Sequence, residues 1–332
     1  MTMFRTRTDP IYRMFLGSWS RILGLCFRQE ICLSSPEFLR LLAIGLAICG
    51  AVFLALGAQF QNDAVTKHHA PDQPRVGSLH IRQVLDLLRR PRWLTGTTFL
   101  LLAILFQLAA LTFAPLIVVQ PIGALALIIT SLLNARIYKV RIDGKTMAAI
   151  AITTAGVGGF VLAASTSATE VEMSNTKLLQ VVGVLLTLLV VFGLLFFRTK
   201  GKVSALHYIF GAGVLYGFVA SLAKVVIVRV TQGDYDLLTL LALAALVGAT
   251  ALGGWFVQNA YASGPPDLVI AGLTVIDPAV AVGIAIVILG EAEGAGFFEI
   301  AGFSVAGLVA IAGVFMLARV HPQLTDDRGQ NE

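Results

Sequence analysis

The stretch Gln258–Glu291, QNAYASGPPDLVIAGLTVIDPAVAVGIAIVILGE, decides how the rest of the sequence is interpreted. It is a long apolar run with a carboxylate well inside it, Asp277, which is followed directly by Pro278. Asp277 lies about ten residues into the predicted span Asp267–Gly290, so a helix would carry it roughly 15 Å deep, near the middle of a bilayer. A charge at that depth is costly and by default indicates a functional site.

The composition of the whole chain points to the same environment. Of its 332 residues 57% are hydrophobic and 13% are charged, and the mean hydropathy is +0.84. A soluble domain carries about 25% charged residues, so these polar side chains are too few to cover a soluble surface. The sequence predicts an all-α, polytopic membrane helix bundle whose partner is the lipid bilayer. The Lys and Arg residues fall between apolar runs, which is typical of cytoplasmic loops and not of nucleic-acid binding.

Nine apolar segments each approach the ~20 residues that a helix needs to cross a bilayer. The runs are too long for strands and show no alternation with a period of two. The nine predicted spans are Leu39–Phe60, Trp93–Phe113, Leu116–Ile137, Met147–Ala164, Leu178–Phe197, Ala205–Val228, Leu238–Tyr261, Asp267–Gly290 and Phe298–Leu317.

The ends of the chain are less apolar. Residues 1–38 form a basic segment, and three arginines within residues 11–33 suggest an interfacial amphipathic helix or disorder, although a tenth span there stays open. We expect a first transmembrane repeat of four helices over residues 39–166, with a cytoplasmic loop at 61–92. A second repeat of five helices follows over residues 177–318, and a cytoplasmic tail over 319–332.

Lys and Arg in the loops predict the orientation. Fifteen of them lie in the first, third and fifth loops and the tail, whereas the loops on the other side hold Lys177 and Arg229. Positive loops stay in the cytoplasm, so the C-terminus is expected there and the chain in the cell (plasma) membrane. Nine spans would then place the N-terminus outside, but six arginines within residues 1–40 oppose this. The side of the N-terminus therefore stays open.

An internal repeat is the most informative pattern. The earlier stretch Gln107–Asn134, QLAALTFAPLIVVQPIGALALIITSLLN, can be aligned with Gln258–Glu291 if six extra residues are allowed in the second copy. The first and sixth spans also correspond loosely, with Gly50–Gln61 over Gly213–Lys224. The two copies enter the membrane from opposite sides, and inverted repeats are typical of secondary transporters. The matched pairs are Gln107 and Gln258, Pro115 and Pro266, Gln120 and Asp277, Pro121 and Pro278, and Asn134 and Glu291.

Asp277 and its repeat counterpart are the leading candidates for a substrate-binding or coupling site. Pro121 and Pro278 cannot donate a backbone hydrogen bond, so we expect each to break its helix and free oxygens for a cation or proton. Gln120 is the neutral counterpart of Asp277. The alternative for Asp277 is a protonated side chain hydrogen-bonded to a neighbouring helix.

Other polar residues on adjacent spans complete the candidate set. The amides of Gln107, Gln258 and Asn259 could contact substrate, but such amides often only bond helix to helix. Lys224 could be a counter-charge for substrate, although snorkelling to the membrane surface is its default explanation. Gly213, Gly217 and Ser221 form a ridge of small residues that predicts close helix packing.

A resemblance to a known family rests on particular motifs. The repeats with Pro-centred spans and the ending Leu289-Gly290-Glu291 resemble the drug/metabolite transporter superfamily with its EamA-type inverted repeats, over roughly residues 39–318. Within it, three motifs are similar to those of NIPA-type magnesium transporters. The Glu and Asn of the NIPA-type second span fall on Ile104 and Gln107 here, so Asp277 would have to supply the carboxylate for magnesium. The three motifs are Pro91-Arg92-Trp93, Phe113-Ala114-Pro115 and Pro121-Ile122-Gly123-Ala124-Leu125.

These observations favour a secondary transporter that moves a small metabolite, drug or cation by alternating access. A NIPA-like magnesium ion transporter is the alternative, and a non-transporting membrane scaffold or partner subunit is the second. We expect no enzyme, because no zinc-protease, nucleophile-elbow or complete phosphate-loop motif is present. No metal site or resident cofactor is expected, with Mg²⁺ or H⁺ entering only as the transported or coupling ion. The sequence leaves a homodimer open.

Overall fold

The computed structural model describes residues 36–66, 91–137, 142–198, 204–264 and 266–320. In these residues the chain is helical, without strands, and nine helices are long and apolar enough to cross a membrane. This confirms the predicted all-α membrane bundle. Residues 11–33, most of the loop at 61–92, and the tail beyond residue 320 lie outside the described residues.

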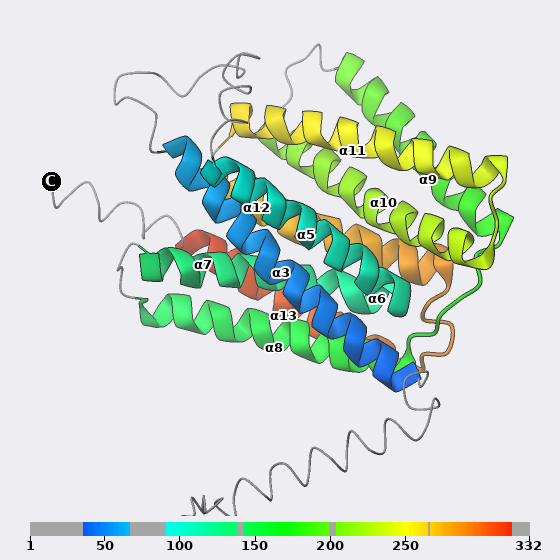
Figure 1. Cartoon of the computed structure of the whole chain (residues 1–332), viewed down its shortest axis with the longest axis horizontal. Helices are drawn as coiled ribbons and strands as arrows, with labels where there is room; N and C mark the ends of the chain where they lie inside the picture. The colour runs from blue at the N-terminus through cyan, green and yellow to red at the C-terminus, as the bar shows by residue number, and fades with distance from the viewer. Residues whose placement is uncertain (1–35, 67–90, 138–141, 199–203, 265, 321–332) are drawn as a thin grey trace, which may run out of the picture. The chain divides into compact units, whose positions relative to one another are not determined.

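The helices follow the predicted spans closely (Figure 1). The third and eighth spans are each divided into shorter pieces, of which η1 is a 3₁₀ helix and η2 a π-helix. The elements are α3 (Pro36–Thr66), α5 (Pro91–Phe113), α6 (Leu116–Val119), η1 (Gln120–Ala124), α7 (Leu125–Ile137), α8 (Gly144–Ser167), α9 (Asn175–Arg198), α10 (Ala205–Gln232), α11 (Leu237–Ser263), α12 (Pro266–Ile284), η2 (Ala285–Leu289) and α13 (Phe297–Val320).

The described residues from Ala43 onward belong to one compact unit, and the packing described below lies within it. Helix α10 is the most buried of the nine spans. In its most apolar part 67% of the residues are buried, against 17% in that of α9. It packs against α11, α12, α5 and α9. Many large apolar residues on the outer helices, above all on α9 and α13, are exposed, as expected where side chains meet lipid.

Small residues let α10 approach α12 closely. A Cβ atom added to Gly213 would lie 2.6 Å from the Cβ of Ile276, and one added to Gly217 would lie 2.7 Å from the Cβ of Val280. Real Cβ atoms do not approach so closely, so both positions need glycine. The close packing predicted for this ridge is confirmed at these two glycines.

Helices α8 and α13 pack side by side and antiparallel, with a reciprocal contact (Figure 1). A Cβ on Gly156 would meet the Cα of Ala310 at 2.6 Å, and one on Gly313 would meet the Cα of Thr153 at 2.8 Å. The same sequence separation divides Gly156 from Gly313 and Thr153 from Ala310. An exchange of equivalent contacts of this kind is what a two-fold axis between the helices produces.

The two proline-containing spans differ from expectation. At Pro121 the backbone turns into the 3₁₀ segment η1 between α6 and α7. At Pro278, however, the expected break is wrong, because α12 continues through this proline to Ile284. The irregular π-helix η2 begins after it, at Ala285. A proline removes one hydrogen bond to the preceding turn, and the rest of the helix can continue around it.

Candidate functional site

Asp277 lies on α12 where this helix meets α10. Its Oδ1 atom is buried and has no hydrogen-bond partner in the described part of the chain. A Cβ on Gly217 would come within 3.0 Å of the Asp277 carbonyl oxygen, so α10 runs directly beside it. The phenol of Tyr216, also on α10, is near enough to interact with the carboxylate electrostatically. An unpaired carboxylate oxygen in this position can accept a proton or contribute to binding a cation.

The four predicted amides lie in different environments. Gln120 is buried within η1, and η1 packs against α12, so the two halves of the Gln120 and Asp277 pair lie on contacting elements. Gln107 is half-buried on α5. Gln258 on α11 is exposed, and the side chain of Asn259 donates to the carbonyl of Trp255 on its own helix, at 2.7 Å. No hydrogen bond to Asp277 is formed by any of the four.

The default explanation for Lys224, snorkelling to the membrane surface, is wrong. The side chain is buried, and Nζ donates to the carbonyl oxygens of Leu111 at 2.7 Å and Ala114 at 2.9 Å. These carbonyls belong to the C-terminal end of α5, where helical carbonyls lack partners and the helix dipole favours a cation. Glu170 lies 3.8 Å from Nζ. Lys224 therefore caps α5 across the bundle.

Glu291, which the internal repeat aligns with Asn134, is a buried charged residue outside the predicted candidate set. Its buried carboxylate accepts hydrogen bonds from the backbone N–H groups of Leu116, at 3.0 Å, and Ile117, at 2.8 Å. Burial raises the pKa of Glu291, while these two hydrogen bonds and the charge of Lys224 partly offset the rise. The carboxylate thus caps the start of α6, a favourable place for a negative charge. An acidic residue placed directly after an apolar run was the available signal.

The backbone around Glu291 is fixed by neighbouring loops. Gly290 ends η2 in the left-handed region, with φ 76°, which turns the chain so that Glu291 points back into the bundle. The Glu291 carbonyl accepts from the N–H of Thr169 at 2.9 Å. Lys177 donates through Nζ to the carbonyl of Leu289 at 2.7 Å. Thr169, between α8 and α9, and Lys177, in the first turn of α9, therefore hold the backbone around Glu291 in position.

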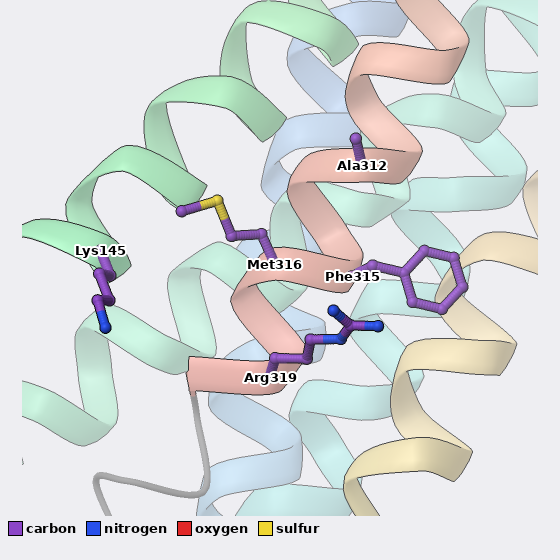
Figure 2. Close-up of a pocket in the computed structure, with 5 residues that line it drawn as sticks. All are labelled: Lys145, Ala312, Phe315, Met316 and Arg319. Carbon is purple, nitrogen blue, oxygen red and sulfur yellow. The ribbon is translucent and has the colours of Figure 1, made fainter.

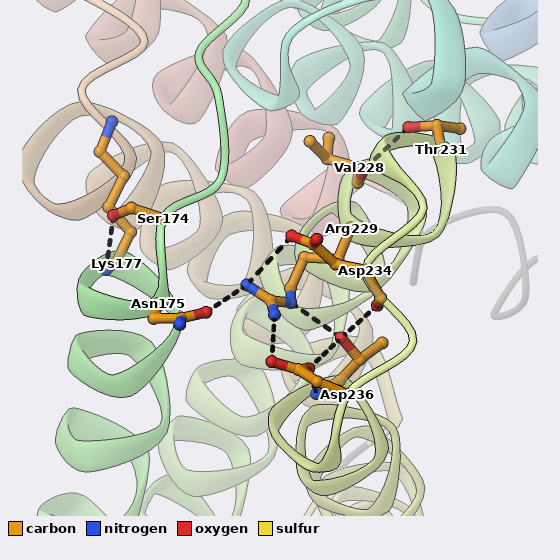
Figure 3. Close-up of polar contacts among 9 residues, drawn as sticks. Ser174, Asn175, Lys177, Val228, Arg229, Thr231, Asp234 and Asp236 are labelled. Carbon is orange, nitrogen blue, oxygen red and sulfur yellow. Dashed lines mark hydrogen bonds and ion pairs between the residues drawn. The ribbon is translucent and has the colours of Figure 1, made fainter.

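Arg229 organises a second polar cluster at the same end of the bundle (Figure 3). Its side chain is 1% exposed and donates to Asn175, Thr239 and Asp236, each at 2.8 Å. Asp236 also accepts from the N–H of Thr239, which caps α11. This hydrogen bond and the charge of Arg229 lower the pKa of Asp236. The cluster ties α9, α10 and α11 together.

The opposite end of the bundle carries a shallow basic pocket (Figure 2). Lys145 projects from the first turn of α8 and Arg319 from the last turn of α13, while Phe315 and Met316 line the rest with Ala312. We call this the Arg319 end and the other the Glu291 end. None of the residues predicted to bind substrate lines this pocket, so it is separate from the surroundings of Asp277.

Comparison with known proteins gives two matches and no assigned family. The chain is 27% identical to an uncharacterized protein of Corynebacterium glutamicum over 281 residues, which covers 84% of this chain and 95% of that protein. It is 37% identical to a probable magnesium transporter of Candida albicans over 112 residues. The second match covers 33% of this chain and only 30% of that protein. No protein-family description and no solved structure matches the chain.

Proposed function

We propose that this protein is a secondary transporter that carries a small cation across the membrane by alternating access, with Asp277 as the charged group of the transport site. One observation carries the proposal: Asp277 keeps a buried carboxylate oxygen that has no hydrogen-bond donor among the described residues, in the middle of an apolar helix. Such a carboxylate is expensive to maintain and is typically retained for binding or coupling. The Lys and Arg distribution supports a cytoplasmic location for the Arg319 end.

Magnesium is the first cation to test. The partial similarity to a probable magnesium transporter supports it, as do the motifs around Phe113-Ala114-Pro115. Mg²⁺ keeps several of its waters and is usually held by one or two carboxylates. Within the described ranges no group of three or more His, Cys, Asp or Glu residues is arranged so that it could hold a metal ion. A largely hydrated ion held by Asp277, with the amide of Gln120 nearby, would suit that arrangement.

The decisive experiment is Mg²⁺ flux into proteoliposomes that contain purified protein. We expect flux in the wild type and its loss in Asp277→Asn, which keeps the shape of the side chain but removes the charge. Glu172→Gln is the matched control, because Glu172 is an exposed acidic residue between α8 and α9. Equal flux in wild type and Asp277→Asn would overturn the assigned role of Asp277.

A small metabolite or drug is the second candidate substrate, since the resemblance to the drug/metabolite transporter superfamily covers most of the chain. In that case Mg²⁺ flux is absent, yet a solute from a metabolite panel raises the melting temperature of wild type more than that of Asp277→Asn. A non-transporting scaffold predicts instead that no solute stabilises the protein and that Asp277→Asn is silent.

A further inference from the structure

Residues at matched positions of the two repeats have different surroundings at the two ends of the bundle. Asn134 and Glu291 occupy matched positions, as do Pro115 and Pro266, so the start of α12 corresponds to the start of α6. Within this alignment Leu268 is the counterpart of Ile117. The comparison of these two places rests on the predicted inverted repeat and on the proposed transport function.

At the Glu291 end the contact between the repeats is closed. Glu291 from the second repeat accepts the N–H groups of Leu116 and Ile117 at the start of α6 in the first. The four residues of α6 are 0% exposed, and the nearby Lys224 contributes a positive charge beside the carboxylate. This end is sealed by a charged side chain, a helix dipole and packed apolar residues.

At the Arg319 end the equivalent contact is absent among the described residues. The Oδ1 atom of Asn134 is buried and has no hydrogen-bond partner in the part of the chain that the structure describes. Leu268 and Ile270, at the start of α12, are 38% and 40% exposed, whereas their counterparts Ile117 and Val119 are each 0% exposed. A buried acceptor without a donor is unfavourable and needs an explanation.

We infer that Glu291 and Asn134 are alternating caps, each of which holds the first turn of the proline-containing span in the other repeat during one half of the transport cycle. In the state described here Glu291 holds α6 and Asn134 is released. In the exchanged state the side-chain oxygen of Asn134 accepts the N–H of Leu268, and Glu291 releases α6. The two residues position the helices and do not bind the substrate.

The chemistry of the two caps also sets the relative populations of the two states. Glu291 is an anion at a helix start beside Lys224, whereas Asn134 is a neutral amide, and hydrogen bonds to charged groups are the stronger ones. The state closed at the Glu291 end is therefore the resting state. A charge added at Asn134, or removed from Glu291, shifts the population toward the exchanged state.

The first test measures accessibility and needs no substrate. Leu268→Cys is introduced into protein whose Cys26, Cys32 and Cys49 are replaced by serine, and its rate of reaction with a water-soluble maleimide is measured. Asn134→Asp and Glu291→Gln are each expected to slow labelling by roughly fivefold or more, because Leu268 becomes covered in the exchanged state. Unchanged labelling in both variants overturns the inference.

A second test separates a positioning role from a structural one. Asn134→Leu removes the orphaned acceptor, so we expect its melting temperature to equal or exceed that of wild type. Mg²⁺ flux into proteoliposomes should nevertheless fall by roughly tenfold, since the exchanged state loses its cap. Asn134→Asp should restore a measurable flux. If Asn134→Leu transports like wild type, the inference is wrong.

The outcomes distinguish this inference from the proposed function. If Mg²⁺ flux is absent but labelling shifts as described, the caps stand and the substrate is a different solute. If Mg²⁺ flux is present in wild type, is unchanged in Asn134→Leu, and the labelling rates do not change, the proposed transport function is supported. The roles of Glu291 and Asn134 as alternating caps are then refuted.

Discussion

The carboxylate of Glu291 lies 2.8 Å from the backbone nitrogen of Ile117, although the two residues are 174 positions apart in the chain. This hydrogen bond joins the end of the eighth span to the start of the third, at a turn of backbone that no local side chain caps. The N–H groups at a helix start need partners, and a distant acid supplies the acceptor for two of them here, those of Leu116 and Ile117. The stability of the protein and the position of α6 therefore depend on the side chain of Glu291.

Glu291→Gln should destabilise the protein. The variant keeps one acceptor oxygen but loses the charge and places an NH₂ group near two backbone donors. We expect a loss of roughly 1–3 kcal/mol in the free energy of unfolding, measurable as a lower melting temperature in detergent. Glu172→Gln on the exposed segment should leave it unchanged. A melting temperature for Glu291→Gln equal to that of wild type would show that the cap contributes little.

Lys224→Met should also destabilise the protein, and the effect should be coupled to Glu291. The substitution strips the carbonyls of Leu111 and Ala114 of their donor and removes the positive charge near Glu291. In a double-mutant cycle with Glu291→Gln, the combined loss should be smaller than the sum by roughly 1 kcal/mol or more. Additive losses would mean that the two side chains act independently.

Acid should weaken the tie between α9, α10 and α11 through Asp236. Its pKa is lowered in the folded protein, so its contribution to stability is present above the unfolded value and is lost as the pH falls through the folded one. The loss is therefore expected below about pH 4. Asp236→Asn should flatten the decline of melting temperature in this range. A decline as steep as that of wild type would assign the acid sensitivity to other carboxylates.

Gly217→Ala should force α10 away from α12. The new methyl group would lie 2.7 Å from the Cβ of Val280 and 3.0 Å from the carbonyl oxygen of Asp277. We expect a loss of roughly 1–3 kcal/mol from overpacking, together with reduced transport because Asp277 is displaced. Gly248→Ala on α11 is the control, since no atom lies within 4 Å of the added carbon. Its stability should stay equal or rise, as alanine favours helices.

The helices could be predicted from sequence more reliably than the contacts between them. Nine apolar runs of sufficient length locate the spans, because each backbone crossing a membrane must satisfy its own hydrogen bonds. The role of Lys224 could not be predicted, since the carbonyls of Leu111 and Ala114 reach it only after α5 and α10 have packed. Glu291 was aligned with Asn134, but its partners on α6 are set by tertiary structure. The repeat itself and the amides Gln107, Gln258 and Asn259 remain predictions.

The reciprocal contact between α8 and α13 has a consequence for how the molecule moves. If the two repeats exchange conformations, Gly156 against Ala310 becomes Gly313 against Thr153, so the seam maps onto itself. An interface of that kind can serve as the rotation axis, because α8 and α13 keep the same contacts while the other helices rotate around them. The glycines Gly156 and Gly313 then lie where the two helices must stay in close contact throughout the cycle. The contacts that break and form again are those at the capped ends.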